Sequence, residues 1–194
     1  MDGWLSLLLG IGLSAACGFR VFVPLLIMSL ASQNGHLALA PGFEWIATPE
    51  ACGAFAVATL CEVISYYIPW WDNLMDSLSS PAAVAAGTIT TASVFTDTSP
   101  FLQWTLAVIA GGGAAGMVQA GTVLVRGASS FTTAGLANPV VSTVELGAAT
   151  ITSILSLLAP IVAVTAVLVL MAMVVRRLSR GRPGFIKPER RLSL

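Results

Sequence analysis

The sequence predicts an all-α membrane protein, a polytopic bundle of about six transmembrane helices. Of its 194 residues, 56% are hydrophobic and only 9% are charged, whereas soluble domains carry about 25% charged residues. The mean hydropathy is +0.88, and the apolar runs reach the length of about 20 residues that a bilayer span requires. Prolines divide these runs and set the expected helix boundaries.

Four helix starts are marked by a capping residue followed by proline, which fits the first helical turn because its missing N–H needs no partner there. These starts are Thr48-Pro49, Ser80-Pro81, Ser99-Pro100 and Asn138-Pro139. Ala159-Pro160 divides the last apolar run, since proline interrupts a helix. The predicted helices cover residues 4–31, 49–69, 81–96, 100–125, 139–157 and 160–178.

The predicted helix over residues 81–96 is too short for an ordinary span, so we expect it to be either a short or a re-entrant helix. An internal echo accompanies it, because Leu78-Ser79-Ser80-Pro81 and Leu136-Ala137-Asn138-Pro139 each follow a helix and a polar loop. One hypothesis is a duplicated helix–loop–helix hairpin, since internal repeats are common in transporters. The alternative is that any two helix starts share a capping residue and a proline.

Residues 1–178 are predicted to form a single bundle domain, and residues 179–194 a basic tail. Seven of the nine Lys and Arg residues follow Val175, and the positive-inside rule therefore predicts a cytoplasmic C-terminus. With six spans, the N-terminus is cytoplasmic as well. This topology puts the 32–48 loop outside and the 70–80 and 126–138 loops inside.

No cofactor or metal is expected. The three cysteines form no CxxC pair and no cluster with the single histidine, so the sequence predicts neither a disulfide framework nor a zinc site. The stretch 111–116 contains GxGxxG, but no strand precedes it, and we reject a nucleotide site. Gly112, Gly116 and Ala120 instead form a small-residue face that favours helix packing and self-association. The expected partners are the bilayer and a small ion or solute, not nucleic acid.

Three charged residues stand alone in long apolar runs, and they are the main functional candidates. Each of Arg20, Glu62 and Glu145 is the single charge in a run of about 20 residues or more. An ionised side chain at the bilayer centre costs about 2.5–3.5 kcal/mol or more. Such residues therefore face a bundle interior, where they mark a transport pathway or an ion pair.

The sequence around Arg20 suggests a broken helix. Pro24 cannot donate a hydrogen bond to the carbonyl oxygen of Arg20, so a cation and an unbonded carbonyl oxygen are expected at one level. Gly10, Ser14 and Gly18 precede them and favour close helix packing. The alternative is structural, with Arg20 tied to a glutamate or to helix-end carbonyl groups.

Polar residues recur at helical spacing in the fourth and fifth predicted helices. Ser142, Glu145 and Thr152 share one helix face, and Gln119 and Arg126 share another. Polar faces in lipid must contact protein or water, so they either hold helices together or line a cavity. The predicted pathway or ion-binding residues are Arg20, Glu62, Gln119, Ser142, Glu145 and Thr152.

A hydroxyl-rich loop is expected over residues 127–138. It leads to a helix N-terminus, where free N–H groups favour anions, so it suggests an anion or lipid-headgroup site; the alternative is a solvated turn. Asp72 and Asp76 stand at helical spacing and suggest either a cation site or a wetted helix face. The candidate headgroup residues are Arg126, Ser129, Ser130, Thr132, Thr133 and Asn138.

Three groups of residues carry a resemblance to a known family. They are Gly18-Phe19-Arg20 with Phe22 and Pro24; Pro69, Asp72, Asp76 and Pro81; and Thr133-Ala134-Gly135-Leu136-Ala137-Asn138-Pro139 followed by Glu145. On these residues the chain resembles a family of small bacterial membrane proteins, domain of unknown function 4126. The resemblance implies a multi-spanning bundle in the bacterial cytoplasmic (inner) membrane, and it brings no assigned activity or substrate.

Three functional hypotheses follow. The first is a transporter or channel for a small ion or solute, with Glu62 and Glu145 as proton or cation sites and Arg20 as their counter-charge. The second is a non-catalytic assembly or scaffold protein whose charges pair internally. The third is a membrane-embedded enzyme acting on a lipid-linked substrate. The absence of a nucleophile–base arrangement and of metal-ligand spacing disfavours it, so we do not expect an enzyme.

Overall fold

The computed structural model describes residues 3–65, 69–96 and 98–180, with side chains for all of these except residues 69–77 and 178–180. No strand occurs among the described residues. A 3-10 helix, η1 (Glu44–Ala47), precedes α3, and a π-helical segment, η2 (Ala107–Gly112), joins α5 to α6. The α-helices are α1 (Gly3–Phe19), α2 (Phe22–Gln33), α3 (Pro49–Ser65), α4 (Pro69–Ser93), α5 (Pro100–Leu106), α6 (Gly113–Thr133), α7 (Asn138–Leu158) and α8 (Pro160–Arg180).

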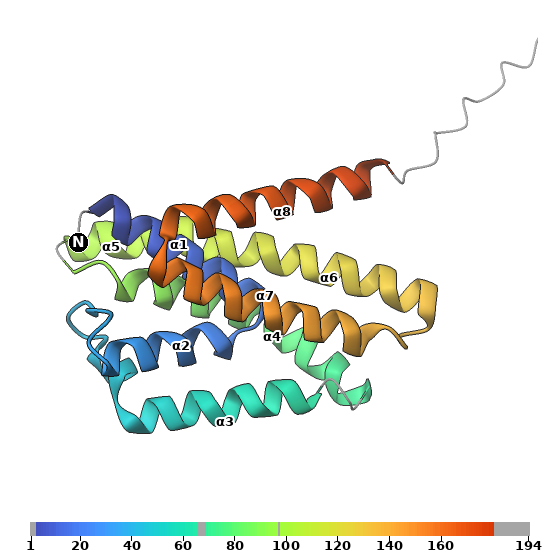
Figure 1. Cartoon of the computed structure of the whole chain (residues 1–194), viewed down its shortest axis with the longest axis horizontal. Coiled ribbons are helices and arrows are strands. Elements are labelled where there is room, and N and C mark those ends of the chain that lie inside the picture. Colours follow the sequence, from blue (N-terminus) through green and yellow to red (C-terminus); the bar gives the residue numbers. More distant parts are fainter. Residues whose placement is uncertain (1–2, 66–68, 97, 181–194) are drawn as a thin grey trace, which may run out of the picture.

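Helices α1 and α2 form a hairpin that enters the bundle and turns back (Figure 1). The first leg packs along α4, where Ser14 Oγ on α1 donates to the carbonyl oxygen of Gly87 at 2.5 Å. The second leg meets α4 at its last residue, where Ser93 Oγ donates to Met28 Sδ on α2 at 3.5 Å. Helix α2 also lies against α3 and α7. The remaining long helices run lengthwise in alternating directions around this hairpin (Figure 1).

Helix α1 is the centre of the bundle and packs on α4, α6 and α7. Its small residues allow this contact, because a Cβ added at Gly18 would lie 2.5 Å from the carbonyl oxygen of Ala115 and 2.6 Å from Val118 Cβ. On the neighbouring helices, a Cβ added at Gly112 would lie 2.7 Å from Thr88 Oγ1. The predicted small-residue faces therefore serve close helix packing.

The single helix predicted over residues 4–31 is wrong, because the helix is interrupted at Arg20 and Val21, between the end of α1 at Phe19 and the start of α2 at Phe22. The short helix predicted over residues 81–96 is also wrong, because Pro81 lies inside α4, which begins twelve residues earlier at Pro69. A helix continues through a proline when its neighbours compensate for the lost hydrogen bond. The element that turns back is therefore the α1–α2 hairpin.

The two segments of the internal echo have different structures. Residues 78–81 lie inside α4, whereas residues 136–138 lead from a turn into α7. The matched residues thus do not mark equivalent helix starts, and they give no support to a duplicated hairpin.

The predicted 127–138 loop is mostly helix. Helix α6 continues to Thr133, and only residues 134–137 form a turn before α7. Ala134 ends α6 in the left-handed conformation with φ of 52°, and Gly135 follows with φ of 84°. The turn is shorter than predicted because left-handed residues close a helix within one or two positions.

Three helices in the described chain are long and apolar enough to cross a membrane, namely Pro100–Thr133, Asn138–Leu158 and Pro160–Arg177. The last two agree with the predicted helices 139–157 and 160–178. Helices α1 and α2 are apolar but shorter. These observations support the predicted membrane protein, whereas the count of six spans is not confirmed.

Gly3 and Arg180 lie at opposite ends of the bundle (Figure 1). The six-span topology places both on one side, and this arrangement is not confirmed. The segment after α2 lies at one end of the bundle, where Ala40 N donates to the carbonyl oxygen of Ser93 at 2.7 Å, and the 134–137 turn lies at the other end (Figure 1). The predicted 70–80 loop is wrong, because these residues belong to α4. Residues 181–194 of the predicted tail lie outside the described residues.

Replacing Ala134 by glycine is expected to stabilise the fold. A left-handed conformation costs an L-residue about 1–2 kcal/mol, a cost that glycine avoids. Ala134→Gly should therefore raise the melting temperature in detergent, measured by circular dichroism. Ala128→Gly, within α6, is the matched control. It should lower the melting temperature, because glycine in a helix costs about 1 kcal/mol of stability relative to alanine. A fall with both variants would contradict the left-handed turn.

Candidate functional site

The reversal between α1 and α2 places Arg20 inside the bundle. Its N–H makes the last α1 bond, to the carbonyl oxygen of Ala16 at 3.1 Å, and α2 begins at Phe22. Pro24 lies in the first turn of α2, where a missing N–H is tolerated, yet it denies the Arg20 carbonyl oxygen its usual helical donor. The arginine therefore projects from a helix break, and its residue is only 5% exposed.

Glu62 on α3 caps the start of α2. Its Oε1 accepts a hydrogen bond from Val21 N at 3.2 Å, and its Oε2 accepts one from Phe22 N at 3.4 Å. The first N–H groups of a helix have no partner within the helix, and that end favours negative charge. The Glu62 carboxylate meets both needs, so α3 holds the turn of the hairpin.

Glu145 on α7 pairs with two arginines. Arg20 Nη2 donates to Oε2 at 2.7 Å. From α6, Arg126 Nη2 donates to Oε2 at 2.9 Å, and its Nε lies 3.3 Å from Oε1 and 3.1 Å from Oε2. Arg126 Nη2 also donates to Ser142 Oγ at 2.6 Å. One carboxylate thus joins the hairpin, α6 and α7. We call Arg20, Glu62, Arg126, Ser142 and Glu145 the tip cluster.

The tip cluster encloses a polar cavity of about 10 Å³. Its lining also includes Ser79, Gln119 and Thr122, together with Phe19 and Val21, which flank Arg20 in the sequence. A water molecule needs about 10–15 Å³ and two to four polar partners. The cavity is therefore the size of a single water.

The tip cluster lies nearer to one end of the bundle. Glu145 is about two turns from the start of α7, and Arg126 is about two turns from the end of α6, or about 10 Å in each case. Both helix ends meet at the 134–137 turn, the end toward which α8 runs (Figure 1). Helix α7 has 21 residues, so about 20 Å separates Glu145 from its opposite end.

Four of the six predicted pathway residues meet in the tip cluster. Gln119 lines its cavity and belongs to the same site. Thr152 does not join them: it lies half-buried about two turns further along α7, where its carbonyl oxygen accepts a 2.6 Å hydrogen bond from Ser156 Oγ. The pairing of Arg20 with a glutamate, one of the two interpretations of this arginine, is present.

Arg126 lies apart from the other predicted headgroup residues. It is 6% exposed in α6 and pairs with Glu145. The helical spacing of Gln119, Thr122 and Arg126 was the signal that placed it on an inward face. The hydroxyl-rich residues after it outweighed this signal because they resemble a polar loop.

The other residues of the predicted headgroup loop bond mainly to one another. Thr132 and Thr133 donate to carbonyl oxygens one turn back, at 2.9 and 2.8 Å, as hydroxyl groups in helices often do. Ser130 Oγ accepts from Asn138 Nδ2 at 3.2 Å. Ser129 Oγ and Asn138 Oδ1 are buried without a hydrogen-bond partner in the described structure. The segment is a compact helix–turn–helix corner, which gives no support to an open anion-binding loop.

No group of three or more His, Cys, Asp or Glu residues that could hold a metal ion occurs in the described part of the chain. The side chains of Asp72 and Asp76, the predicted alternative cation pair, lie outside the described residues.

Removing Glu145 is expected to destabilise the fold more than removing Arg126. Loss of one partner of a buried ion pair costs about 3–5 kcal/mol. Glu145→Gln removes the carboxylate that pairs with both Arg20 and Arg126, whereas Arg126→Gln leaves Glu145 paired with Arg20. The double variant should lose less stability than the sum of the losses in the two single variants. In the double variant neither Arg126 nor Glu145 remains as a charge without the other. Thermal unfolding in detergent measures all three.

Glu50→Gln is the control for this cycle, because Glu50 is exposed at the start of α3 and its replacement should change stability by about 0.5 kcal/mol or less. Additive losses in the double variant would show that Arg126 and Glu145 are not energetically coupled.

Comparison with known proteins agrees with the resemblance found in the sequence. The model of the family described as Domain of unknown function (DUF4126) matches residues 7–180, which includes every member of the tip cluster. No curated protein and no solved structure matches the chain. This membrane protein therefore belongs to the DUF4126 family.

Proposed function

We propose that the protein moves a small ion or solute across the bilayer and that the tip cluster is the site of exchange. The observation that carries the proposal is a broken helical hairpin whose tip holds two arginines and two glutamates. Discontinuous helices with their free ends turned toward a buried charged site are a recurring basis of transport in membranes. Buried charges that only stabilise a helix pair do not require the helix to break.

Glu62 is the carboxylate we assign to exchange. Its two bonds, to Val21 N and Phe22 N, are long at 3.2 and 3.4 Å, whereas Glu145 receives closer bonds from two guanidinium groups. Freeing the Glu62 carboxylate from its hydrogen bonds therefore breaks fewer interactions than freeing the Glu145 carboxylate. It also frees the start of α2, so a proton or cation at Glu62 would loosen the hairpin and open the cavity. Arg20 remains as the counter-charge.

The same proposal orients the molecule. Seven of the nine Lys and Arg residues follow Val175. The first three of them, Arg176, Arg177 and Arg180, lie on the last part of α8, which runs toward the end nearer the tip cluster (Figure 1). By the positive-inside rule this end faces the cytoplasm of a bacterial inner membrane. The hairpin then opens toward the outside, so Gly3 lies outside rather than on the cytoplasmic side.

A second candidate function, a membrane assembly or scaffold protein, is favoured by a different observation. The tip cluster contains equal numbers of arginines and glutamates, and its carboxylates bond to protein groups. A neutral, internally bonded cluster serves to fix one arrangement of helices. The two functions differ in whether Glu62 must change its bonds during activity.

Glu62→Gln is expected to abolish transport while leaving the fold intact. Glutamine keeps one of the two acceptor oxygens, enough to accept from Val21 N or Phe22 N at the start of α2, but the amide exchanges no proton. The measurement is dissipation of an imposed pH gradient in proteoliposomes, followed with an internal pH dye, with Na⁺, K⁺ and Cl⁻ varied in turn. Wild-type liposomes should lose the gradient faster than empty ones, and Glu62→Gln liposomes should match empty ones.

Glu50→Gln, on the exposed start of the same helix, should keep the wild-type rate. The transport proposal fails if folded wild-type protein gives no dissipation above empty liposomes under any of these ions. It also fails if Glu62→Gln retains the full rate, because the flux would then bypass the tip cluster. Either outcome favours the assembly function.

A further inference from the structure

The cavity of the tip cluster reaches the surface of the bundle beside α4. Arg20, Glu62, Gln119 and Glu145 line it and are buried. Among the described polar residues of the lining, Ser79 on α4 alone is partly exposed. The hydroxyl group of Ser79 is therefore the polar group through which the cavity meets its surroundings.

This opening lies in the half of the bundle that the proposed orientation places toward the cytoplasm. Ser79 is about 15 Å along α4 from Pro69, and α4 begins on the side of the bundle toward which α8 runs (Figure 1). Beside it, Ser80 Oγ accepts a hydrogen bond from Gln119 Nε2 on α6 at 3.5 Å. Polar side chains of α4 and α6 therefore meet at the opening.

The lining of the cavity suits a water molecule better than a metal ion or an anion. The guanidinium groups of Arg20 and Arg126 offer only N–H donors and repel a cation. The carboxylates of Glu62 and Glu145 repel an anion in the same way. A water molecule accepts from the first pair and donates to the second, and the cavity of about 10 Å³ has room for one. A proton that passes through this water needs no further space.

The groups around the cavity leave Glu62 as the acceptor of a proton. Glu145 bonds to Arg20 and Arg126, so a proton there would displace a guanidinium group, whereas Glu62 bonds to two backbone N–H groups. Cys17 of α1 is buried and bonds to a threonine of α4, outside the lining. Of the helices that pack on α3, α2 carries no charged residue, and α4 carries two aspartates whose side chains lie outside the described residues, Asp72 and Asp76.

We propose that the ion exchanged at the tip cluster is a proton, which moves between Ser79 and Glu62 through one water molecule in the cavity. The Ser79 hydroxyl group takes up a proton from the cytoplasmic side and passes its own to the water, which passes one to a Glu62 oxygen. Each transfer forms one O–H bond and breaks another, so the hydroxyl group and the water are regenerated and the carboxylate becomes a carboxylic acid. The inference rests on the proposed transport function and names its ion and one half of its path.

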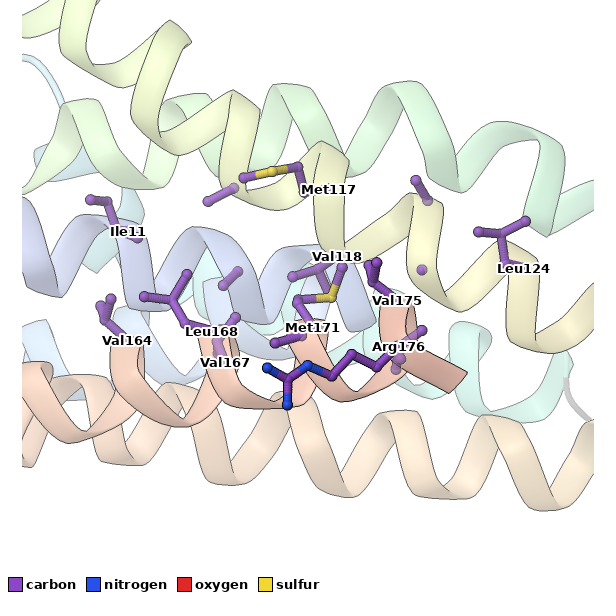
Figure 2. Close-up of a pocket in the computed structure, with 16 residues that line it drawn as sticks. Ile11, Met117, Val118, Leu124, Val164, Val167, Leu168, Met171, Val175 and Arg176 are labelled. Carbon is purple, nitrogen blue, oxygen red and sulfur yellow. The ribbon is translucent and has the colours of Figure 1, made fainter. Parts of the chain in front are cut away.

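A larger opening in the described structure does not suit a proton. An apolar groove of about 610 Å³ runs between α6 and α8. Figure 2 shows Met117 and Leu124 on α6 across from Leu168 on α8. Apart from Arg176, the residues that line the groove are apolar, and proton transfer needs groups that both donate and accept hydrogen bonds. The groove therefore has no part in the proposed path.

Proton flux in proteoliposomes tests the ion. The salts are potassium gluconate and N-methylglucamine gluconate, and an internal pH dye follows an imposed pH gradient. Wild-type liposomes should lose the gradient faster than empty ones without Na⁺ or Cl⁻. The loss should be complete only with valinomycin, because an unaccompanied proton carries a charge that K⁺ must balance.

The same assay tests the path with variants of nearly equal shape. Ser79→Val removes the hydroxyl group and should lower the rate about tenfold, the effect of one hydrogen bond on a rate. Ser79→Thr keeps a hydroxyl group and should keep the rate. Thr88→Val, further along α4 and outside the lining, is the control and should match the wild type. Ser79→Ala adds no atom to the bundle and should lower the rate as well, so a misfolded Ser79→Val leaves the test intact.

The outcomes separate this inference from the proposed function. Dissipation that needs Na⁺ or Cl⁻, or that is equally complete without valinomycin, would keep the transport function and overturn the unaccompanied proton. Equal rates for Ser79→Val and Ser79→Thr, at equal melting temperatures, would overturn the path through Ser79. If folded wild-type protein dissipates no gradient with any ion, the transport function fails and this inference fails with it.

Discussion

The shared carboxylate of Glu145 is the interaction on which the arrangement of the bundle depends. Two arginines, Arg20 from the hairpin tip and Arg126 from α6, donate to it, and both are buried. Without a carboxylate between them, two cations would face each other at membrane depth, where unpaired charge is strongly unfavourable. This single group therefore decides how the hairpin, α6 and α7 can sit together. It also explains why a helix that stops within the bundle is tolerated there.

The hairpin concentrates the polar requirements of the fold at one point. A helix break exposes N–H groups that lipid cannot satisfy, and Glu62 supplies their acceptor from a separate helix. Close packing at Gly18 brings α1 against α6, which places Arg126 within reach of the tip. The resulting cavity has room for about one water molecule. The transport proposed for this site would therefore require the hairpin turn to change its bonds.

Helix α6 separates two chemically different environments. Its inward face carries Gln119 and Arg126 to the tip cluster, while its outer face carries Met117 and Leu124 to the groove beside α8.

The sequence by itself determined the membrane class, the last two apolar helices and three members of the charged site. Long apolar runs and their bounding prolines are local properties, and the isolation of Arg20, Glu62 and Glu145 is costly in lipid wherever the chain goes. Only the tertiary structure decided their partners, because the bond from Arg20 to Glu145 spans 125 residues and depends on which helices touch. Pro24 indicated a break after Arg20, but the direction of α2 beyond it is set by packing against α3 and α7. The sequence could not decide the place of Arg126 for the same reason. The hydroxyl-rich residues after it suit a loop or a helix end equally well, and contact with α7 selects the helix.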